Sequence, residues 1–313
     1  MNLSRRHLLA TGAAAMTLPG AALAQTVPAE TVPAAGPPIL KRRVPQTGTM
    51  LPVVGIGTSR VFEWENDPAK LELRKQVVRH LVAGGGSLID TAAGYGTAEA
   101  NVGTVAAETN LRPRLFLATK YSSGDTSAQA EAELKQSFQR LRTNYVDLQQ
   151  AWNVNDPNFS CAQMKEWKAA GRCRHWGITS SFDGAYDALA AVLKRERPEF
   201  FQINYSLGDR DAEKVLLPAA QDAGCAVLTN LPFGRNTMFA RVKGKPLPDF
   251  AKEIDCTSFA QLFLKYNLSH PAVTAVIPGT DLPNYMLDNL NAGRGRMPDA
   301  AMRRRIETWF DTV

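Results

Sequence analysis

The sequence has 313 residues, of which 44% are hydrophobic and 21% are charged, a composition that excludes disordered and fibrous proteins. The net charge is +6, but Arg5 and Arg6 lie in a segment that we expect to be removed, which leaves 34 basic and 30 acidic residues and a net charge of +4. So small an excess gives no reason to expect a nucleic-acid partner. No apolar run approaches the roughly 20 residues that span a bilayer, so we expect no stable membrane anchor.

Residues 1–24 have the features of an export signal. A pair of arginines precedes the apolar stretch AAAMTLPGAALA, whose last three residues, Ala22-Leu23-Ala24, have the small-x-small pattern of a signal-peptidase site. An arginine pair followed by Leu-Leu is typical of signals read by the twin-arginine translocase, which exports folded proteins. We therefore expect an exported, periplasmic protein; a general secretory signal is the alternative.

Residues 25–39 are rich in Pro and Ala and predict an extended tether without a core of its own. From residue 40 to 313, short apolar runs alternate with longer amphipathic stretches, of which residues 127–142 show helical spacing along one face. Residues 42–54, with a Thr-Gly turn, predict a hairpin. Eight strand-helix units favour the α/β class and a (β/α)8 TIM barrel over an open sheet. The predicted strands are 53–59, 87–93, 115–120, 146–152, 174–180, 200–206, 225–231 and 273–279.

In a barrel of this kind, the chemistry lies where the strands end. Asp90 and Lys120 close two consecutive strands, and Tyr95 follows in a glycine-flanked loop, so the three should converge at the barrel mouth. A lysine cation close to the phenol should lower the pKa of Tyr95, and such a tyrosine can deliver a proton near neutral pH. Taken singly, each residue also has a structural interpretation, in which the aspartate caps a helix, the tyrosine packs and the lysine is solvated.

The remaining conspicuous features predict structure. The Gly-Ile-Gly at 55–57 lacks the third glycine of a dinucleotide-binding fingerprint, and the glycines at 84–86 predict a helix end and a turn. No pair of histidines or cysteines has metal-ligand spacing, so we expect no metal site. The three arginines at 303–305 precede apolar residues and predict a terminal helix with a docked apolar side and a solvated basic face, with anion or membrane binding there as the alternative.

Six motifs resemble those of the aldo/keto reductase family, in that family's order. The similarity runs from about Val44 to about Asn291. It implies a (β/α)8 barrel that binds an extended nicotinamide cofactor, NADP(H) rather than NAD(H), and reduces a small-molecule aldehyde or ketone. The motifs are LIDTAAGYGTAEANVG at 88–103, ATK at 118–120, YVDLQQ at 145–150, GRCRHWGITS at 171–180, FFQINYS at 200–206 and VIPGT at 276–280.

The resemblance also implies roles for single residues. Asp90, Tyr95 and Lys120 would act together, with Tyr95 giving a proton to the carbonyl oxygen while hydride arrives from the nicotinamide. The remaining positions would hold the cofactor: Thr179, Ser180 and Gln202 at the carboxamide, Leu231, Gly279 and Thr280 near the phosphates, Asn289 at the adenine, and Thr58, Asp90 and Asn230 elsewhere along it.

The chain departs from the family pattern at several positions. Trp152 stands where the family usually has a histidine; its indole N–H can donate a hydrogen bond but cannot titrate, so Trp152 is either a catalytic donor or an apolar wall. Asn230 stands where many members stack a tyrosine on the nicotinamide, and Gly279 and Tyr285 stand where members that select NADPH carry Lys and Arg.

Two hypotheses follow from these patterns. The first is an NAD(P)H-dependent aldo/keto reductase with Tyr95 as general acid. The second is a catalytically weakened barrel that acts as a cofactor- or ligand-binding protein. In either case we expect a monomer. Four loop aromatics either line a substrate pocket or pack within their loops: Phe62, Trp64, Phe233 and Phe239.

Overall fold

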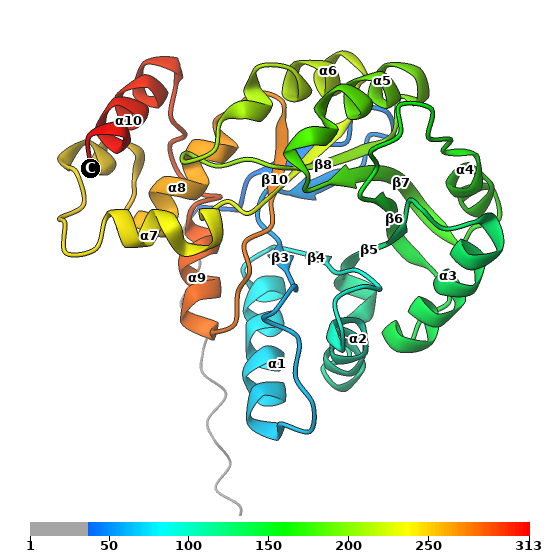
Figure 1. The fold of residues 1–313 in the computed structure, drawn as a ribbon. Helices are drawn as coiled ribbons and strands as arrows, with labels where there is room; N and C mark the ends of the chain where they lie inside the picture. The colour runs from blue at the N-terminus through cyan, green and yellow to red at the C-terminus, as the bar shows by residue number, and fades with distance from the viewer. Residues whose placement is uncertain (1–36) are drawn as a thin grey trace, which may run out of the picture. The chain divides into compact units, whose positions relative to one another are not determined.

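The structure, a computed structural model, describes residues 37–313, so the predicted signal and nearly all of the predicted tether lie outside the described residues. The described residues form a (β/α)8 barrel with a short hairpin at its N-terminal side (Figure 1). This confirms the predicted fold. Among residues 37–313, none of the helices combines the length and the apolar character needed to span a bilayer.

The barrel consists of eight parallel strands that follow one another in sequence order. Each of the eight predicted strand ranges contains or overlaps one of them. The barrel closes where Gly55 N donates to the Val276 carbonyl at 2.9 Å and where Gly57 forms a parallel bridge with Gly279. The strands are β3 (Ile56–Gly57), β4 (Leu88–Asp90), β5 (Phe116–Ser122), β6 (Val146–Trp152), β7 (Cys173–Ser180), β8 (Phe200–Asn204), β9 (Ala226–Asn230) and β10 (Val273–Val276).

Two glycines make this closure possible. A Cβ on Gly57 would lie 2.7 Å from the Ile277 carbonyl oxygen, and one on Gly55 would lie 2.8 Å from the Leu88 carbonyl oxygen. Any side chain would therefore push β3 away from its neighbours. The Gly-Ile-Gly sequence thus serves the closing seam of the barrel.

Helices cover the outside of the barrel (Figure 1). The predicted helix at 127–142 is α3 (Ser127–Leu141), which begins with a capping box between Thr126 and Gln129. The glycines at 84–86 follow the end of α1, as predicted. The other helices are α1 (Pro68–Ala83), α2 (Ala98–Glu108), α4 (Ala162–Ala169), α5 (Tyr186–Glu196), α6 (Leu216–Asp222), α7 (Thr237–Arg241), α8 (Phe259–Leu268), α9 (Pro283–Asn291) and α10 (Ala300–Thr312), with 3₁₀ turns η1 (Arg112–Arg114), η2 (Asp183–Ala185), η3 (Asp211–Glu213), η4 (Gly234–Asn236) and η5 (Asp249–Ile254).

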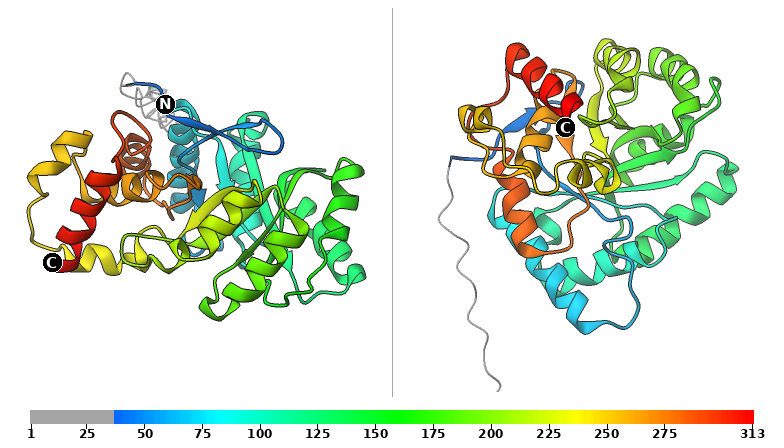
Figure 2. Two further views of the ribbon diagram at one scale, coloured as in Figure 1. Left: turned by 90° about the horizontal axis from the view of Figure 1, so that it is seen from above. Right: turned by 60° about the vertical axis from the view of Figure 1, so that its left-hand side comes forward.

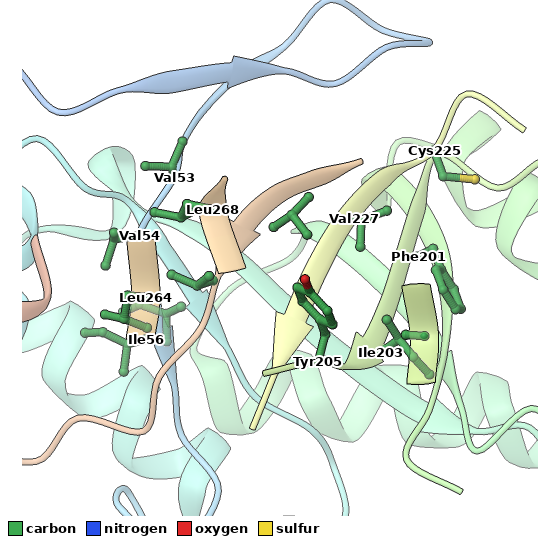
Figure 3. Close-up of a cluster of buried hydrophobic side chains, with 14 of the residues drawn as sticks. Val53, Val54, Ile56, Phe201, Ile203, Tyr205, Cys225, Val227, Leu264 and Leu268 are labelled. Carbon is green, nitrogen blue, oxygen red and sulfur yellow. The ribbon is translucent and has the colours of Figure 1, made fainter. Parts of the chain in front are cut away.

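The core has an outer and an inner layer, because successive side chains of a strand point to opposite faces. The outer layer lies between the strands and the helices, where Ile56 and Val227 belong to the same buried cluster as Leu264 of α8 (Figure 3). The inner layer fills the N-terminal half of the barrel and contains Phe116 and Phe200. The C-terminal half is therefore left for polar groups.

The predicted hairpin consists of β1 (Lys41–Arg43) and β2 (Met50–Pro52), which pair antiparallel. Gly48 has a φ of +77°, a left-handed conformation that glycine adopts readily and that lets the chain reverse. Val44 and Leu51 of the hairpin join the inner layer. The hairpin therefore closes the N-terminal end of the barrel.

The terminal helix α10 differs from the prediction in one respect. Its apolar residues Ile306 and Phe310 are buried, as expected. Arg303, however, does not belong to a solvated face: it donates to Glu213 Oε1 at 2.7 Å and to the Tyr205 hydroxyl at 2.9 Å. The sequence could not indicate this, because Glu213 and Tyr205 lie about ninety to a hundred positions away along the chain.

The contacts of α10 reach the segment that follows β9. Arg241 of α7 donates to the Phe310 carbonyl at 2.8 Å, and Trp309 stacks on Phe259 of α8 at 6.0 Å between ring centroids. Figure 2 shows α10 beside this segment. The terminal helix therefore packs against the segment that follows β9, which begins at the C-terminal ends of the strands.

We predict that Arg303→Met lowers the free energy of unfolding by about 2 kcal/mol, because it leaves Glu213 and the Tyr205 hydroxyl without their charged partner; the value is below that of a fully buried pair because Glu213 is partly exposed. Urea denaturation measures the change. The control is Arg304→Met, at the exposed neighbouring position, for which we expect a change within about 0.5 kcal/mol. Equal midpoints for the two variants would show that the Arg303 contacts do not stabilise the docked helix.

Candidate active site

A cavity of about 420 Å³ opens at the C-terminal ends of the strands. Its position is the one that barrel enzymes use for their chemistry. Ten of the residues predicted from the sequence line it: Thr58, Asp90, Tyr95, Lys120, Trp152, Thr179, Gln202, Asn230, Leu231 and Gly279.

Asp90 and Lys120 form a buried ion pair at the floor of this cavity. Lys120 Nζ lies 2.8 Å from Asp90 Oδ1, 2.7 Å from Asp90 Oδ2 and 2.7 Å from the Thr91 carbonyl oxygen. The strand register explains the pair: Asp90 is opposite Ala118 on the next strand, and Lys120 lies two residues further on, so both side chains project into the barrel.

Burial and the charge of the partner shift the pKa of each member of this pair in opposite directions. Burial is the largest single effect and disfavours the charged form of Lys120, but the charge and hydrogen bonds of Asp90, together with Tyr95 and Glu99, outweigh it and raise the pKa of Lys120 above its usual value. Burial raises the pKa of Asp90, and Lys120 and the amides of Gln202 and Gln150 work against that rise. All these donors favour the carboxylate form of Asp90. The carboxylate in turn holds the charged Lys120 ammonium in place at the floor of the cavity.

Tyr95 lies above this ammonium. Lys120 Nζ is 5.3 Å from the centroid of the Tyr95 ring. The expected lowering of the pKa of Tyr95 is wrong for this structure: burial raises it, the Lys120 cation opposes that rise, and Asp90 adds to it. The phenol is therefore protonated at neutral pH and is a hydrogen-bond and proton donor.

Trp152 contacts Tyr95 edge to face, with ring centroids 5.4 Å apart and an interplanar angle of 82°. Gly94 makes room for the indole, since a Cβ at that position would lie 2.5 Å from Trp152 Cζ3. The glycine before Tyr95 is thus needed for close approach of the tryptophan. The indole is a wall of the cavity and a direct neighbour of the phenol.

One side chain of this polar cluster was not predicted from the sequence. Gln150 Nε2 donates to Gln202 Oε1 at 2.8 Å and to Asp90 Oδ1 at 3.4 Å. Its place in the register could have indicated this, because Gln150 is opposite Lys120 on the neighbouring strand and faces the same interior. The other residues that line the cavity are Gly57, Ser59, Arg60, Val61, Ser181, Pro232, Phe233, Arg235, Asn236 and Ile277, of which Phe233 was considered from the sequence as a pocket residue.

Three predicted cofactor residues do not line the cavity. Asn289 Nδ2 donates to Thr280 Oγ1 at 3.0 Å, and Thr280 Oγ1 donates to the Pro278 carbonyl at 3.1 Å. Ser180 Oγ accepts from the Phe182 amide at 3.3 Å. These three polar side chains are buried and engaged with protein groups, so their roles toward a cofactor stay predictions.

The loop aromatics mostly pack within the protein. Phe62 and Trp64 are buried, and Phe239 lies 4.9 Å from Phe233 and 5.6 Å from Phe263 between ring centroids. Of the four aromatics considered, Phe233 lines the cavity. For the other three, the interpretation as loop packing holds.

Unpartnered polar atoms and unusual backbone mark the wall where a polar ligand can bind. Among the described residues, the hydroxyl of Thr58 and Oδ1 of Asn230 are buried without a hydrogen-bond partner, although both residues line the cavity. The segment after β9 has left-handed backbone at Leu231, with φ of 51°, and again at Arg235 and Asn236. Such conformations are strained for residues other than glycine and cluster at ligand sites.

The sequence model of the Aldo/keto reductase family matches residues 53–307. The methylglyoxal reductase YeaE of Escherichia coli is 29% identical over 233 residues, which are 72% of this chain and 80% of that protein. The aldo-keto reductase YhdN of Bacillus subtilis is 29% identical over 196 residues, 57% of each chain.

An aldo-keto reductase of Klebsiella pneumoniae, solved in complex with NADPH, has a similar fold, with a TM-score of 0.72 and 23% identity. The match covers 87% of this chain and 96% of that one. The barrel holds a buried Asp90–Lys120 pair beneath Tyr95, and the family model matches most of the chain. Together these observations establish the family. The chain belongs to the Aldo/keto reductase family of oxidoreductases.

Proposed function

We propose that the protein reduces an aldehyde or ketone with a nicotinamide cofactor and that Tyr95 is the general acid. The observation that carries this proposal is the Lys120 ammonium, which is held by Asp90 on one side and lies 5.3 Å from the Tyr95 ring on the other. A protonated phenol above a fixed cation is what proton transfer to a carbonyl oxygen requires.

The residues act in the following way. Tyr95 holds a proton on its hydroxyl and donates it to the carbonyl oxygen, on which negative charge develops. Lys120 favours the phenolate that remains, and Asp90 keeps the ammonium oriented. When bound, the cofactor supplies the hydride. Trp152 restricts access of water to the phenol from its side of the cavity.

The cavity wall fits such a cofactor. Gln202 and Thr179 offer polar groups for a carboxamide, and the unpartnered hydroxyl of Thr58 and Oδ1 of Asn230 can bind further polar atoms. Gly279 lines the cavity without a side chain, and a Cβ there would make only ordinary contacts, 3.7 Å from Val61 Cγ1 and 3.9 Å from the Gly57 carbonyl oxygen.

We propose NADP(H) rather than NAD(H). Exposed Arg60 and Arg235 lie at the cavity and can bind phosphate oxygens, and the Klebsiella structural neighbour was solved with NADPH. Fluorescence titration of the mature chain with NADPH and with NADH tests the choice. Equal or tighter binding of NADH would overturn it.

A second function has one specific observation in its favour. Trp152 occupies the position where the sequence leads us to expect histidine, and an indole cannot become a cation that polarises a carbonyl. Removal of a polarising donor lowers catalytic rates by about 10² to 10³. The alternative is therefore a weakened barrel that binds the cofactor or another ligand without efficient turnover.

We predict that Tyr95→Phe lowers kcat/KM for carbonyl reduction by about 10² to 10⁴, because the proton donor is lost while the ring remains. Cofactor binding should change less than about threefold. The matched control is Tyr145→Phe, on a ring that packs against Arg112 outside the cavity. Unchanged turnover in Tyr95→Phe would refute the proposed acid. Cofactor binding without turnover in the wild type would favour the alternative function.

The pH dependence follows from the raised pKa of Tyr95. A proton donor acts in its protonated form, so activity is present below its pKa and is lost as the pH rises through it. Because burial raises this pKa, we predict that kcat/KM for reduction stays constant through neutral pH and declines only above about 10, the usual value for tyrosine. A decline centred near neutral pH would contradict the structure and support the lowered pKa expected from the sequence.

We also propose that the mature protein is exported to the periplasm by the twin-arginine translocase. The arginine pair supports this, and the four cysteines are buried, free thiols whose pKa is raised to about 12 by burial, which suits folding in a reducing compartment before export. Replacing Arg5 and Arg6 with lysines should retain the protein in the cytoplasm, as measured by cell fractionation. Undiminished export of that variant would contradict the proposal.

A further inference from the structure

A layer of buried polar side chains lies in the barrel around the Asp90–Lys120 pair. Asp90 comes from β4, Gln150 from β6 and Gln202 from β8, which are alternate strands, and all three are at most 2% exposed. Alternate strands of a barrel contribute side chains to the same interior layer. In this layer, the three side chains bond to one another.

The three side chains form a closed ring of hydrogen bonds. Gln150 Nε2 is 2.8 Å from Gln202 Oε1 and 3.4 Å from Asp90 Oδ1. Gln202 Nε2 is 3.3 Å from Asp90 Oδ2. Each carboxylate oxygen thus faces one glutamine amide as well as the Lys120 ammonium.

The carboxylate dictates which way both amides point. A carboxylate only accepts hydrogen bonds, so each glutamine must turn its NH₂ group toward Asp90. Gln202 Oε1 then points toward Gln150, whose NH₂ group donates to both Gln202 Oε1 and Asp90 Oδ1. If the Gln150 amide were reversed, its oxygen would face two other oxygens. Gln150 and Asp90 together therefore hold Gln202 in the orientation in which it reaches the cavity.

Gln150 itself does not line the cavity, whereas Gln202 and Asp90 do. Its own Oε1 is buried without a hydrogen-bond partner among the described residues. A buried unpartnered oxygen is unfavourable, so an apolar residue would suit this position better if packing were its only role. What distinguishes Gln150 is the double donation by Nε2.

We infer that Gln150 is a positioning residue for the proposed reduction: through Nε2 it fixes, together with Asp90, the amide orientation of Gln202 toward the nicotinamide carboxamide, and it orients the Asp90 carboxylate. The inference rests on the proposed function, because it concerns the same cavity. Without the Gln150 donor, Gln202 Oε1 loses its partner and the Gln202 amide is oriented only by its 3.3 Å bond to Asp90, while Asp90 itself loses one of its partners.

The chain provides a matched control. Gln149 is the next residue on β6, is 1% exposed and also has a buried Oε1 without a partner among the described residues. Because side chains alternate along a strand, Gln149 points to the opposite face, away from the barrel interior. Gln149→Leu and Gln150→Leu thus make the same chemical change at equal burial, on opposite sides of one strand.

The experiment compares Gln150→Leu, Gln150→Glu and Gln149→Leu with the wild type. Nicotinamide Kd is measured by fluorescence as a function of pH, together with kcat and KM for a carbonyl substrate and the thermal midpoint. We expect Gln150→Leu to raise the cofactor Kd by about tenfold, the loss of one well-oriented hydrogen bond, and to lower kcat as well. Gln149→Leu should leave these values near those of the wild type.

Gln150→Glu keeps the shape of the side chain and replaces the donor by a carboxyl group beside Asp90. Two adjacent carboxyl groups share a proton, so this variant should bind cofactor more weakly as the pH rises, while the wild type should not. That pH dependence reports whether position 150 is coupled through Asp90 to the cofactor site, and the loss of the donor itself is read from Gln150→Leu. The variant also keeps the test valid if leucine disturbs the fold.

The outcomes separate the inference from the function on which it rests. If both Gln150 variants match Gln149→Leu in Kd, kcat and pH dependence, the positioning role is overturned and the reductase proposal stands. If the wild type neither binds nicotinamide nor turns over a carbonyl, the proposed function fails and the inference fails with it.

Discussion

The structure of the site depends on one constraint, which is that a lysine and an aspartate are buried together inside a barrel. Removing either charge from water is unfavourable by several kcal/mol, and the pair is tolerated only where geometry and further hydrogen bonds compensate. Lys120 meets both oxygens of Asp90 and the Thr91 carbonyl, and the two glutamine amides complete the surroundings of the carboxylate. The polar layer of the barrel is organised around this pair.

The rest of the fold keeps that layer in place. Below it, apolar side chains and the N-terminal hairpin fill the barrel, and at the seam Gly55 and Gly57 let the first and last strands approach. Above this layer, Tyr95 and Trp152 contact each other in the wall of the cavity. The segment that follows β9 forms another wall, and α10 packs against its far part through Arg241 and Phe310.

Much of the site could be predicted from strand ends. Asp90 and Lys120 each close an apolar run, and parallel strands bring their C-terminal ends to one rim, so convergence followed from chain order. Gln150 was missed because it is one of two adjacent glutamines and a single sequence does not distinguish their faces without the register. Ser180, Thr280 and Asn289 were predicted at the cofactor, but their side chains bond to neighbouring protein groups. The direction of the pKa shift of Tyr95 depends on its burial, which no local pattern reports.

The sequence by itself determined the barrel, the strand order and the convergence of Asp90, Tyr95 and Lys120 at one cavity, because hydrophobic periodicity and chain order act locally and along neighbouring strands. Only the tertiary structure decided which polar atoms meet. The ring of Asp90, Gln150 and Gln202 joins residues 52 to 112 positions apart, and Arg303 reaches Glu213 across 90 positions. These contacts between residues far apart in sequence form only when the barrel closes, because closure brings side chains of alternate strands within hydrogen-bonding distance.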